Sequence, residues 1–386
     1  MISEIPTAEF QERIRRVQTE LAARRLDALL TFGNEAEPQF VRYFSDFWPA
    51  FETAGVLIPV EGEPLLIIGP ESLTYAQGRS KIPQIRQVLA YRESSEPEYP
   101  GKQLETYASL FDEISGGKGI RRLGLVGFPI TTVPVWEGLR TAMTGNEMVR
   151  ADDIVVEMRK IKSENELALL RQAFHISELA IEAVLDQIKP GMSEVQVVGI
   201  AQEVMYRNGA EYEGHPLYVL SGRHSAGAIG RPTLKKIHEG EVIQLNIGAR
   251  FGGYSSSVGR PVVLGRMPDD VRALLQMGLD AADKTMEIMR AGVEAAWVAQ
   301  TIKDYVTERG YGDTLLYGPC HGLGLMECEH PWMETNSDYV LQENCTFQVD
   351  SFLYTPDYGA RWEDGVRVTH DGVEHFSNCR RELLVL

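Results

Sequence analysis

Basic charge, cysteine and long apolar runs are all scarce in this chain of 386 residues. Its 38 Lys and Arg are outnumbered by 55 Asp and Glu, which gives a formal net charge of -17. Nucleic acids and anionic membrane surfaces are bound through basic surface, so this balance argues against both kinds of partner. We therefore expect a protein whose partner is a small-molecule substrate.

The four cysteines all lie in the last fifth of the chain, at Cys320, Cys328, Cys345 and Cys379. They include no CxxC pair of the kind that binds zinc, and no signal peptide is recognised before them. We expect reduced, buried thiols and a cytoplasmic location. No apolar run approaches the length that spans a bilayer, so we expect no membrane insertion.

Length and pattern predict an α+β protein of two domains, at residues 1–155 and 160–386. The first domain shows a helical pattern at 8–25, then apolar runs such as LDALLTF and GVLIPV, and another helix near 103–114. The EGEP turn predicts an antiparallel hairpin inside this otherwise α/β pattern. A short charged stretch at 152–162 marks the boundary.

The second domain opens with two predicted capping boxes, Ser163 with Glu166 and Ser193 with Gln196. Each box satisfies backbone N–H groups at a helix start, so we expect helices to begin there. Strands follow after Ser221. The further predicted features are hairpins at 252–253 and 371–372 and helices at 269–290 and 295–309.

Alternation in two strand-like runs places polar residues together. In VIQLNI, Gln244 and Asn246 point to one face and the aliphatic residues to the other. In TFQVDSF, Gln348 and Asp350 share a face in the same way. Polar side chains turned into a sheet are costly unless they are solvated or used, so we expect both runs to meet at a cavity.

Four segments carry the residues that suggest chemistry. They are LNIGARFGGYSSSVGRP with Asn246 and Ser257, CHGLGLMECEHP with His321, FQVDSFLY with Asp350, and RWEDGVRVTHDG with Glu363. In order and spacing they resemble the ligand motifs of the pita-bread hydrolase family, which includes prolidase, aminopeptidase P, methionine aminopeptidase and the metal-free creatinase. The resemblance covers nearly the whole chain. It implies a creatinase-type N-terminal α/β domain, then a pita-bread domain with helices outside a curved antiparallel sheet.

In the metallopeptidases of that family the five positions supply Asp, Asp, His, Glu and Glu to two divalent ions. Two carboxylates are therefore missing here, which leaves Asp350 and Glu363 to balance four positive charges. Unit charges about 3.5 Å apart repel by about 5 kcal/mol at an effective dielectric of about 20, and divalent ions about four times more. We predict no metal cofactor. The alternative is a single divalent ion at His321, Asp350 and Glu363.

The resemblance and the missing ligands together predict a creatinase-like hydrolase. We expect a homodimer that cleaves a C–N bond in a small, cationic amide or amidine compound without a dinuclear metal centre. One alternative is a metal-dependent Xaa-Pro dipeptidase or aminopeptidase. A second is a non-catalytic binding module, because pita-bread domains also occur in histone chaperones.

The predicted catalytic residues are His321, Glu363, Asp350 and Glu329. His321 would shuttle protons, while Glu363 and Asp350 would activate water or hold a cationic group. A structural alternative exists for each of these three: a backbone hydrogen bond for His321, and a bridge to Arg361 or Arg260 for the two carboxylates.

Further residues are predicted to bind substrate. Asn246, Tyr254 and Ser257 would orient it through neutral hydrogen bonds. A histidine near the family's catalytic position, His224 or His215, could supply a second imidazole or be a structural loop residue. His330 stands two residues after Cys328, which occupies the position of a second family histidine, so it could replace that group or cap a turn. The predicted substrate-binding set is Asn246, Tyr254, Ser257, Arg361, His224, Glu52 and His330.

Overall fold

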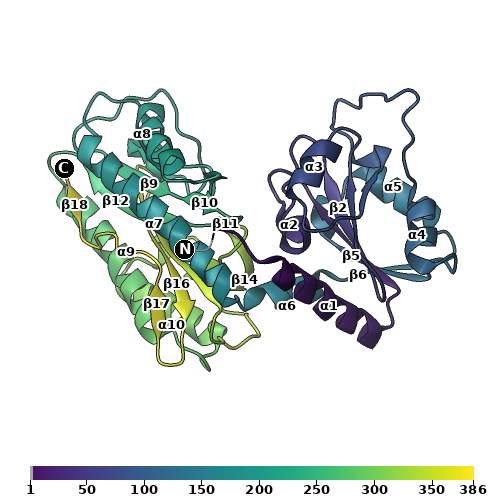
Figure 1. The fold of residues 1–386 in the computed structure, drawn as a ribbon. Helices are drawn as coiled ribbons and strands as arrows, with labels where there is room; N and C mark the ends of the chain where they lie inside the picture. The colour runs from purple at the N-terminus through teal and green to yellow at the C-terminus, as the bar shows by residue number, and fades with distance from the viewer. Residues whose placement is uncertain (1–2) are drawn as a thin grey trace. The chain divides into compact units, whose positions relative to one another are not determined.

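The computed structural model describes residues 3–386, which divide into two compact units (Figure 1). One comprises Ile5–Met158, and the other comprises Arg159–Leu386 together with residues 3–4. The division falls between the two predicted ranges. It lies inside helix α6 (Asp152–Lys160), where we had expected only a charged linking stretch. The two-domain α+β architecture predicted from the sequence is confirmed.

The N-terminal unit contains a six-stranded mixed sheet in the order β4-β3-β2-β1-β5-β6. Its strands are β1 (Ala28–Gly33), β2 (Ala54–Pro59), β3 (Leu65–Ile68), β4 (Ile85–Gln87), β5 (Arg122–Val126) and β6 (Glu147–Arg150). Strands β2 and β3 form the antiparallel hairpin predicted at EGEP, while β1, β5 and β6 run parallel. The predicted α/β pattern with an internal hairpin is therefore correct.

Helices lie on either side of this sheet (Figure 1). They are α1 (Thr7–Arg24), α2 (Gln39–Ser45), α3 (Leu73–Arg79), α4 (Tyr107–Ser115) and α5 (Val133–Ala142). The predicted helices at 8–25 and 103–114 correspond to α1 and α4. Helices α4 and α5 bury Leu110 and Leu139 against Leu30 of β1 and Leu123 of β5, which gives this unit a core of its own.

The C-terminal unit contains a nine-stranded sheet among its described residues, with the main order β14-β13-β15-β16-β12-β9-β8. Strand β17 pairs with β16, and β18 pairs with β12. The strands of this sheet are β8 (Tyr218–Ser221), β9 (Val242–Ile247), β12 (Val258–Val263), β13 (Cys320–Gly322), β14 (Glu329–Met333), β15 (Thr346–Tyr354), β16 (Gly359–Val368), β17 (Val373–His375) and β18 (Leu384–Val385). A small second sheet joins β7 (Tyr212–Glu213), β10 (Ala249–Phe251) and β11 (Tyr254–Ser255).

The helices of the C-terminal unit are α7 (Glu164–Gln187), α8 (Glu194–Arg207), α9 (Asp269–Ile288) and α10 (Ala295–Glu308). Both predicted capping boxes are present at the starts of α7 and α8. Residues of α9 and α10 pack with Phe347 and Trp362 from β15 and β16 in one apolar cluster. Because side chains alternate along a strand, Gln348 and Glu363 face the opposite side of the sheet.

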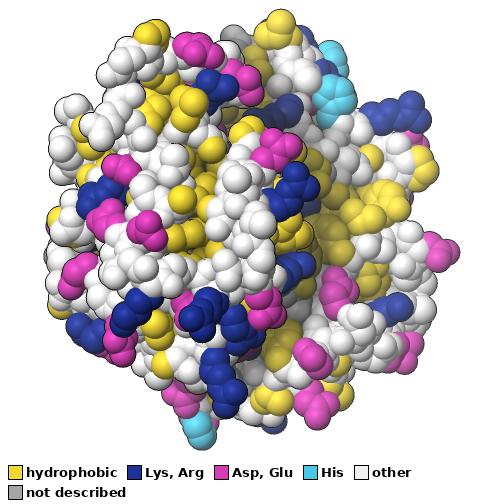
Figure 2. Space-filling model, turned by 90° about the vertical axis from the view of Figure 1, so that its right-hand side faces the viewer, with side chains coloured by type: hydrophobic (Ala, Val, Ile, Leu, Met, Phe, Trp, Pro, Cys, Tyr) yellow, Lys and Arg dark blue, Asp and Glu magenta, His cyan; other side chains and the backbone are white. Residues whose placement is uncertain are grey.

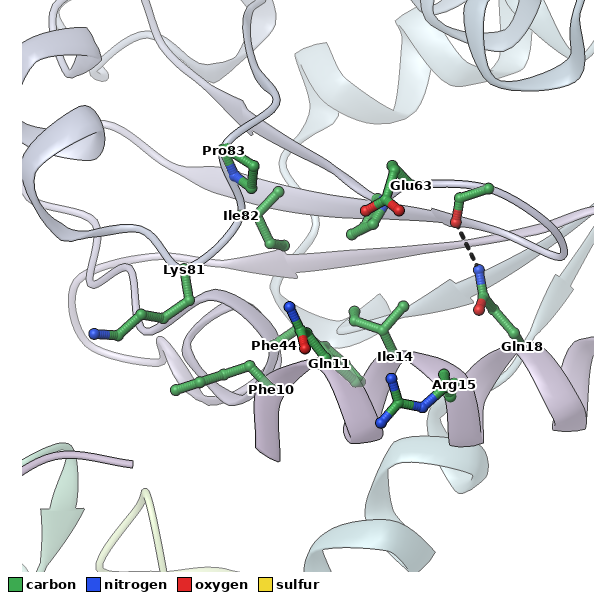
Figure 3. A pocket seen from close by; sticks show the side chains of 12 residues that line it. Phe10, Gln11, Ile14, Arg15, Gln18, Phe44, Glu63, Lys81, Ile82 and Pro83 are labelled. Carbon is green, nitrogen blue, oxygen red and sulfur yellow. Dashed lines mark hydrogen bonds between the residues drawn. The ribbon is translucent and has the colours of Figure 1, made fainter. Parts of the chain in front are cut away.

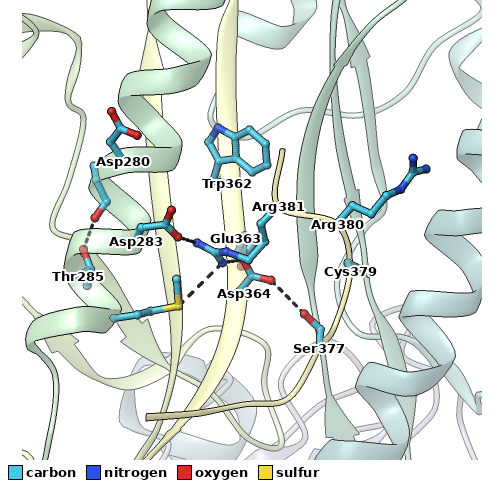
Figure 4. A network of polar contacts seen from close by, with 12 residues as sticks. Asp280, Asp283, Thr285, Trp362, Glu363, Asp364, Ser377, Cys379, Arg380 and Arg381 are labelled. Atoms are coloured by element: carbon cyan, nitrogen blue, oxygen red, sulfur yellow. Dashed lines mark hydrogen bonds and ion pairs between the residues drawn. The ribbon is translucent and has the colours of Figure 1, made fainter. Parts of the chain in front are cut away.

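Asp364 follows Glu363 in β16 and points to the other face of the sheet, where it joins a buried charge cluster (Figure 4). Arg260 lies 2.6 Å from one of its carboxylate oxygens, and Arg381 pairs with both Asp364 and Asp283. These pairs join the C-terminal segment to β12, β16 and α9. The guanidinium of Arg260 is therefore engaged by Asp364, and it reaches Glu363 only at the backbone carbonyl.

Glu329, predicted to be catalytic, begins β14 and is held by two buried cations. Lys162 Nζ lies 2.9 Å from one carboxylate oxygen, and Arg159 contacts the other. Burial alone would raise the pKa of Glu329, but the positive charges of Arg159 and Lys162 bring it below its ordinary value. This arrangement indicates a structural role, because both oxygens are taken up by partners that fasten β14 to the end of α6.

We predict that Glu329→Gln lowers the free energy of unfolding by about 3–5 kcal/mol, because it removes the negative charge that Glu329 places beside the buried Arg159 and Lys162. Chemical denaturation at pH 7 measures the change. A matched control is Glu147→Gln, which breaks the exposed pair with Arg122 and should cost under about 1 kcal/mol. Because the folded-state pKa is lowered, the stabilisation is present above the unfolded pKa and lost on acidification, so the difference from wild type should shrink below about pH 4. Equal unfolding curves at pH 7 would contradict the structural role.

Candidate active site

Neighbouring strands place three of the motif positions in one row across the sheet, with Gly259 between two of them. Asn246 of β9 pairs with Gly259 of β12, which pairs with Glu363 of β16, which pairs with Asp350 of β15. A Cβ atom at Gly259 would lie 2.6 Å from the Cβ of Glu363 and 3.1 Å from the Asn246 amide nitrogen. A glycine is therefore needed for Asn246 and Glu363 to meet across β12.

The next row adds the imidazole. His321 of β13 pairs with Gln348 of β15, two residues before Asp350 on the same face. All these side chains are at least nine-tenths buried. The strand alternation predicted from VIQLNI and TFQVDSF is thus the arrangement observed, and the polar faces of both strands meet.

Glu363 is the centre of the hydrogen-bond network. Ser257 Oγ donates to its Oε2 at 3.0 Å, Asn246 Nδ2 donates to the same oxygen, and Gln348 Nε2 donates to Oε1 at 3.0 Å. Burial, followed by the negative charge of Glu327, raises the pKa of Glu363 well above its ordinary value. Burial also raises the pKa of Glu327, the other carboxyl of this group.

His321 directs a lone pair toward these two carboxylates. Its Nδ1 lies 3.1 Å from the carbonyl oxygen of Gly322, which can only accept, so Nδ1 carries the hydrogen and the neutral ring presents Nε2 as an acceptor. That Nε2 lies 3.6 Å from Glu327 Oε1 and 4.0 Å from Glu363 Oε1. One ligand atom from each residue lies within 4.8 Å of the others. Three acceptors that converge in this way fit a cation between them.

Asp350 lies beside this group but is engaged by other partners. Tyr317 donates to its Oδ2 at 2.6 Å, and Arg361 Nε lies 3.3 Å from Oδ1. The same Arg361 donates to the Tyr317 hydroxyl at 2.8 Å. The structural alternative for Asp350, a bridge to Arg361, is therefore observed. The sequence predicted His321, Asp350 and Glu363 as the ligands of a single ion. In the structure, the carboxylate that converges with His321 and Glu363 is that of Glu327.

Two predicted substrate-binding residues have structural partners. The hydroxyl of Tyr254 donates to Glu166 Oε1 at 2.6 Å, inside the capping box of α7. His224 Nδ1 lies 3.2 Å from both oxygens of the fully buried Glu194. Of the two histidines considered for a second imidazole, His215 is the one that reaches the network, with Nε2 2.9 Å from Ser257 Oγ.

Glu52 lies in the N-terminal unit, where its buried carboxylate accepts hydrogen bonds from the backbone of Glu71 and from Ser72 at the start of α3. His330 is exposed. Substrate binding by these two residues stays a prediction. Three of the four cysteines are buried, as expected, but Cys328 is exposed, because it lies in the turn between β13 and β14.

Glu327 and Gln348 are functional candidates to which the sequence analysis gave no catalytic, binding or metal role. Glu327 was visible in the segment MECEH, but it lies in an irregular turn where no periodicity shows which way a side chain points. Gln348 had been placed on the face of Asp350, and its amide could have been recognised as a donor. Only the observed path of residues 323–328, between β13 and β14, shows that Glu327 and not one of its acidic neighbours faces His321.

The donor set fits one divalent ion. The two carboxylates balance the two positive charges of the ion. Together with the neutral imidazole they offer the mixed oxygen and nitrogen ligands that Mn²⁺, Fe²⁺ and Zn²⁺ accept. A histidine that gives its other N–H to a backbone carbonyl, as His321 does, is the usual arrangement at metal sites. The amide oxygens of Asn246 and Gln348 are buried without a hydrogen-bond partner, which also favours a cation nearby.

A dinuclear centre does not fit these residues. Asn246 and Ser257 carry no charge and both donate to Glu363, while Asp350 is neutralised by Arg361. A second dication would therefore add two positive charges that no free carboxylate of the site balances. The charge argument made from the sequence against two ions therefore also applies to the contacts in the structure, but it does not extend to a single ion.

Other parts of the described structure are weaker candidates for a functional site. A cavity of about 400 Å³ in the N-terminal unit lies between α1 and the segment 62–64 with 81–83, lined by Phe10, Ile14 and Gln18 among others (Figure 3). Gln18 donates to the carbonyl of Gly62, and Arg15 pairs with Glu12, so these two polar side chains of the cavity make local contacts. On the face seen in Figure 2, Lys and Arg are interspersed with Asp and Glu. No helix among residues 3–386 is both long and apolar enough to cross a membrane.

Comparison with known proteins gives relatives along the whole chain. The Xaa-Pro dipeptidase of Pyrococcus furiosus is 26% identical over 93% of this chain and 99% of its own length. The crystal structure of an X-Pro aminopeptidase from Thermotoga maritima superposes with a TM-score of 0.84 at 25% identity, covering 97% of this chain and 99% of that one. The structure of a Xaa-Pro dipeptidase from Bacillus anthracis superposes with a TM-score of 0.83 at 26% identity. The match covers 98% of this chain and 100% of that one.

Two family descriptions match the two units. Residues 13–161 match the Creatinase/Prolidase N-terminal domain, and residues 168–370 match Metallopeptidase family M24. The predicted family, its fold and a hydrolase related to the Xaa-Pro peptidases are therefore confirmed, whereas the creatinase-like, metal-free activity is not supported. By its sequence, its fold and the strand positions of its site residues, this chain belongs to metallopeptidase family M24.

Proposed function

We propose that this protein hydrolyses Xaa-Pro dipeptides with one divalent ion held by His321, Glu327 and Glu363. The observation that carries the proposal is the convergence of three acceptors within 4.8 Å in a family of metallopeptidases. The substrate class is taken from the relatives, which are named Xaa-Pro dipeptidases and match nearly the whole chain. The alternative function predicted from the sequence thus becomes the preferred one.

The residues of this chain would act in distinct ways. A divalent ion, when bound, polarises a carbonyl and makes a coordinated water more acidic. Asn246, Ser257 and Gln348 hold Glu363 in one orientation by hydrogen bonds. The backbone carbonyl of Gly322 fixes the His321 tautomer that presents Nε2. Such preorganisation matters because small misplacements of reacting groups are costly.

Hydrolysis should require the bound divalent ion and a proline in the dipeptide substrate. We expect the purified chain to contain about one Mn²⁺, Fe²⁺ or Zn²⁺, and to cleave Xaa-Pro dipeptides at least about 10-fold faster than the matched Xaa-Ala dipeptides. A chelator should abolish cleavage and added metal should restore it, as followed by amino-acid release and elemental analysis. Cleavage of a cationic amide or amidine by ion-free, chelator-treated protein would instead support the creatinase-like activity.

The assignment of Glu327 as a ligand has its own test. Glu327→Gln removes one of two ligand charges with little change in shape, so Mn²⁺ affinity measured by calorimetry should fall by about 100-fold or more. Asp350→Asn is the matched control, because Asp350 is already bound to Arg361 and Tyr317 and should affect affinity by less than about 10-fold. The reverse order of the two effects would restore the ligand set predicted from the sequence.

The assembly and location expected from the sequence complete the proposal. We expect a cytoplasmic homodimer with a small-molecule substrate and without a nucleic-acid or membrane partner. The acidic net charge of -17 and the mixed charges of the face in Figure 2 support the absence of nucleic-acid and membrane partners. Size-exclusion chromatography with light scattering distinguishes a dimer from a chain of 43.2 kDa.

A further inference from the structure

His215 is held against the site although none of the roles above uses it. Its Nε2 lies 2.9 Å from Ser257 Oγ, its Nδ1 lies 2.7 Å from the carbonyl oxygen of Pro216, and its ring meets Tyr218 edge-on at 5.3 Å. The ring is therefore fixed on three sides. Such fixing of a partly exposed histidine indicates that its orientation matters.

Two glycines allow this approach. A Cβ atom at Gly214 would lie 2.4 Å from the carbonyl oxygen of Ser256. A Cβ atom at Gly248 would lie 2.0 Å from the same oxygen and 3.0 Å from the His215 ring. The backbone N–H of Gly214 donates to Gly248 at 2.7 Å. The segment before His215 can therefore lie directly against Gly248 and Ser256, which neighbour the site residues Asn246 and Ser257.

The hydrogen atoms in this contact can be assigned. The Pro216 carbonyl only accepts, so His215 Nδ1 carries a hydrogen, and in the neutral ring Nε2 is an acceptor. The Ser257 hydroxyl has one hydrogen and two acceptors within reach, His215 Nε2 at 2.9 Å and Glu363 Oε2 at 3.0 Å. Whichever acceptor takes this hydrogen deprives the other of it.

We propose that His215 is a positioning residue: when a cation binds Glu363 Oε2, the Ser257 hydroxyl hydrogen turns from that oxygen to His215 Nε2. Without His215, the hydroxyl would keep donating to Glu363 and withdraw negative charge from a ligand oxygen. Burial lowers the pKa of His215, which favours the neutral ring that this role requires. The inference rests on the proposed function, since it assigns His215 to the support of the ion site.

Metal affinity of the full-length chain tests the inference without reference to activity. His215→Phe removes the acceptor and should weaken Mn²⁺ binding, measured by calorimetry and by electron paramagnetic resonance, about 10- to 100-fold. His215→Gln places an amide oxygen near the position of Nε2, can still accept from Ser257, and should bind within about 3-fold of wild type. His175→Phe, on the exposed face of α7, is the control for losing a histidine elsewhere.

A double-mutant cycle separates positioning from a general structural effect. In a Ser257→Ala background no hydroxyl hydrogen remains to be diverted, so His215→Phe should cause no further loss of Mn²⁺ affinity. An equal loss with and without Ser257 would overturn the inference, as would wild-type affinity in His215→Phe, with thermal unfolding confirming that each variant folds. Wild-type protein that binds no Mn²⁺ would overturn the proposed function and this inference together, whereas the two preceding outcomes overturn the inference alone.

Discussion

The burial of the Glu363 carboxylate is the constraint on which the rest of the site depends. An ionised carboxylate taken out of water is costly unless hydrogen bonds and opposite charge compensate it. Three neutral donors, Asn246, Ser257 and Gln348, supply the hydrogen bonds. They supply no charge, so the carboxyl either keeps a proton, as its raised pKa indicates for the isolated chain, or accepts a cation.

Charge compensation also separates acidic residues that look equivalent in the sequence. Glu329 is held by Arg159 and Lys162, and Asp350 by Arg361. Among the described residues, neither Glu327 nor Glu363 forms an ion pair with a Lys or Arg. Their combined charge therefore remains for a ligand to balance. This distribution explains how a chain with two altered ligand positions can still suit one divalent ion but not two.

Much of the framework could be predicted because it follows from local patterns. The capping boxes, the glycine hairpins and the alternation in VIQLNI and TFQVDSF each depend on neighbours a few residues apart, and each is observed. The motif resemblance selected His321, Asp350 and Glu363, which the structure places on the neighbouring strands β13, β15 and β16. The sequence did not show contacts between residues that are distant in sequence: Glu329 meets cations about 170 residues away, and His224 lies beside Glu194.

The sequence by itself determined the family, the two-domain α+β fold and the replacement of two ligand carboxylates by Asn246 and Ser257, because residue identity and spacing are sufficient for these. Only the tertiary structure decided which carboxylate joins His321 and Glu363, and which histidine reaches Ser257. The physical reason is that the direction of a side chain in an irregular turn, such as that of Glu327, is set by long-range packing. The same packing brings each acidic group to a cation or leaves it without one.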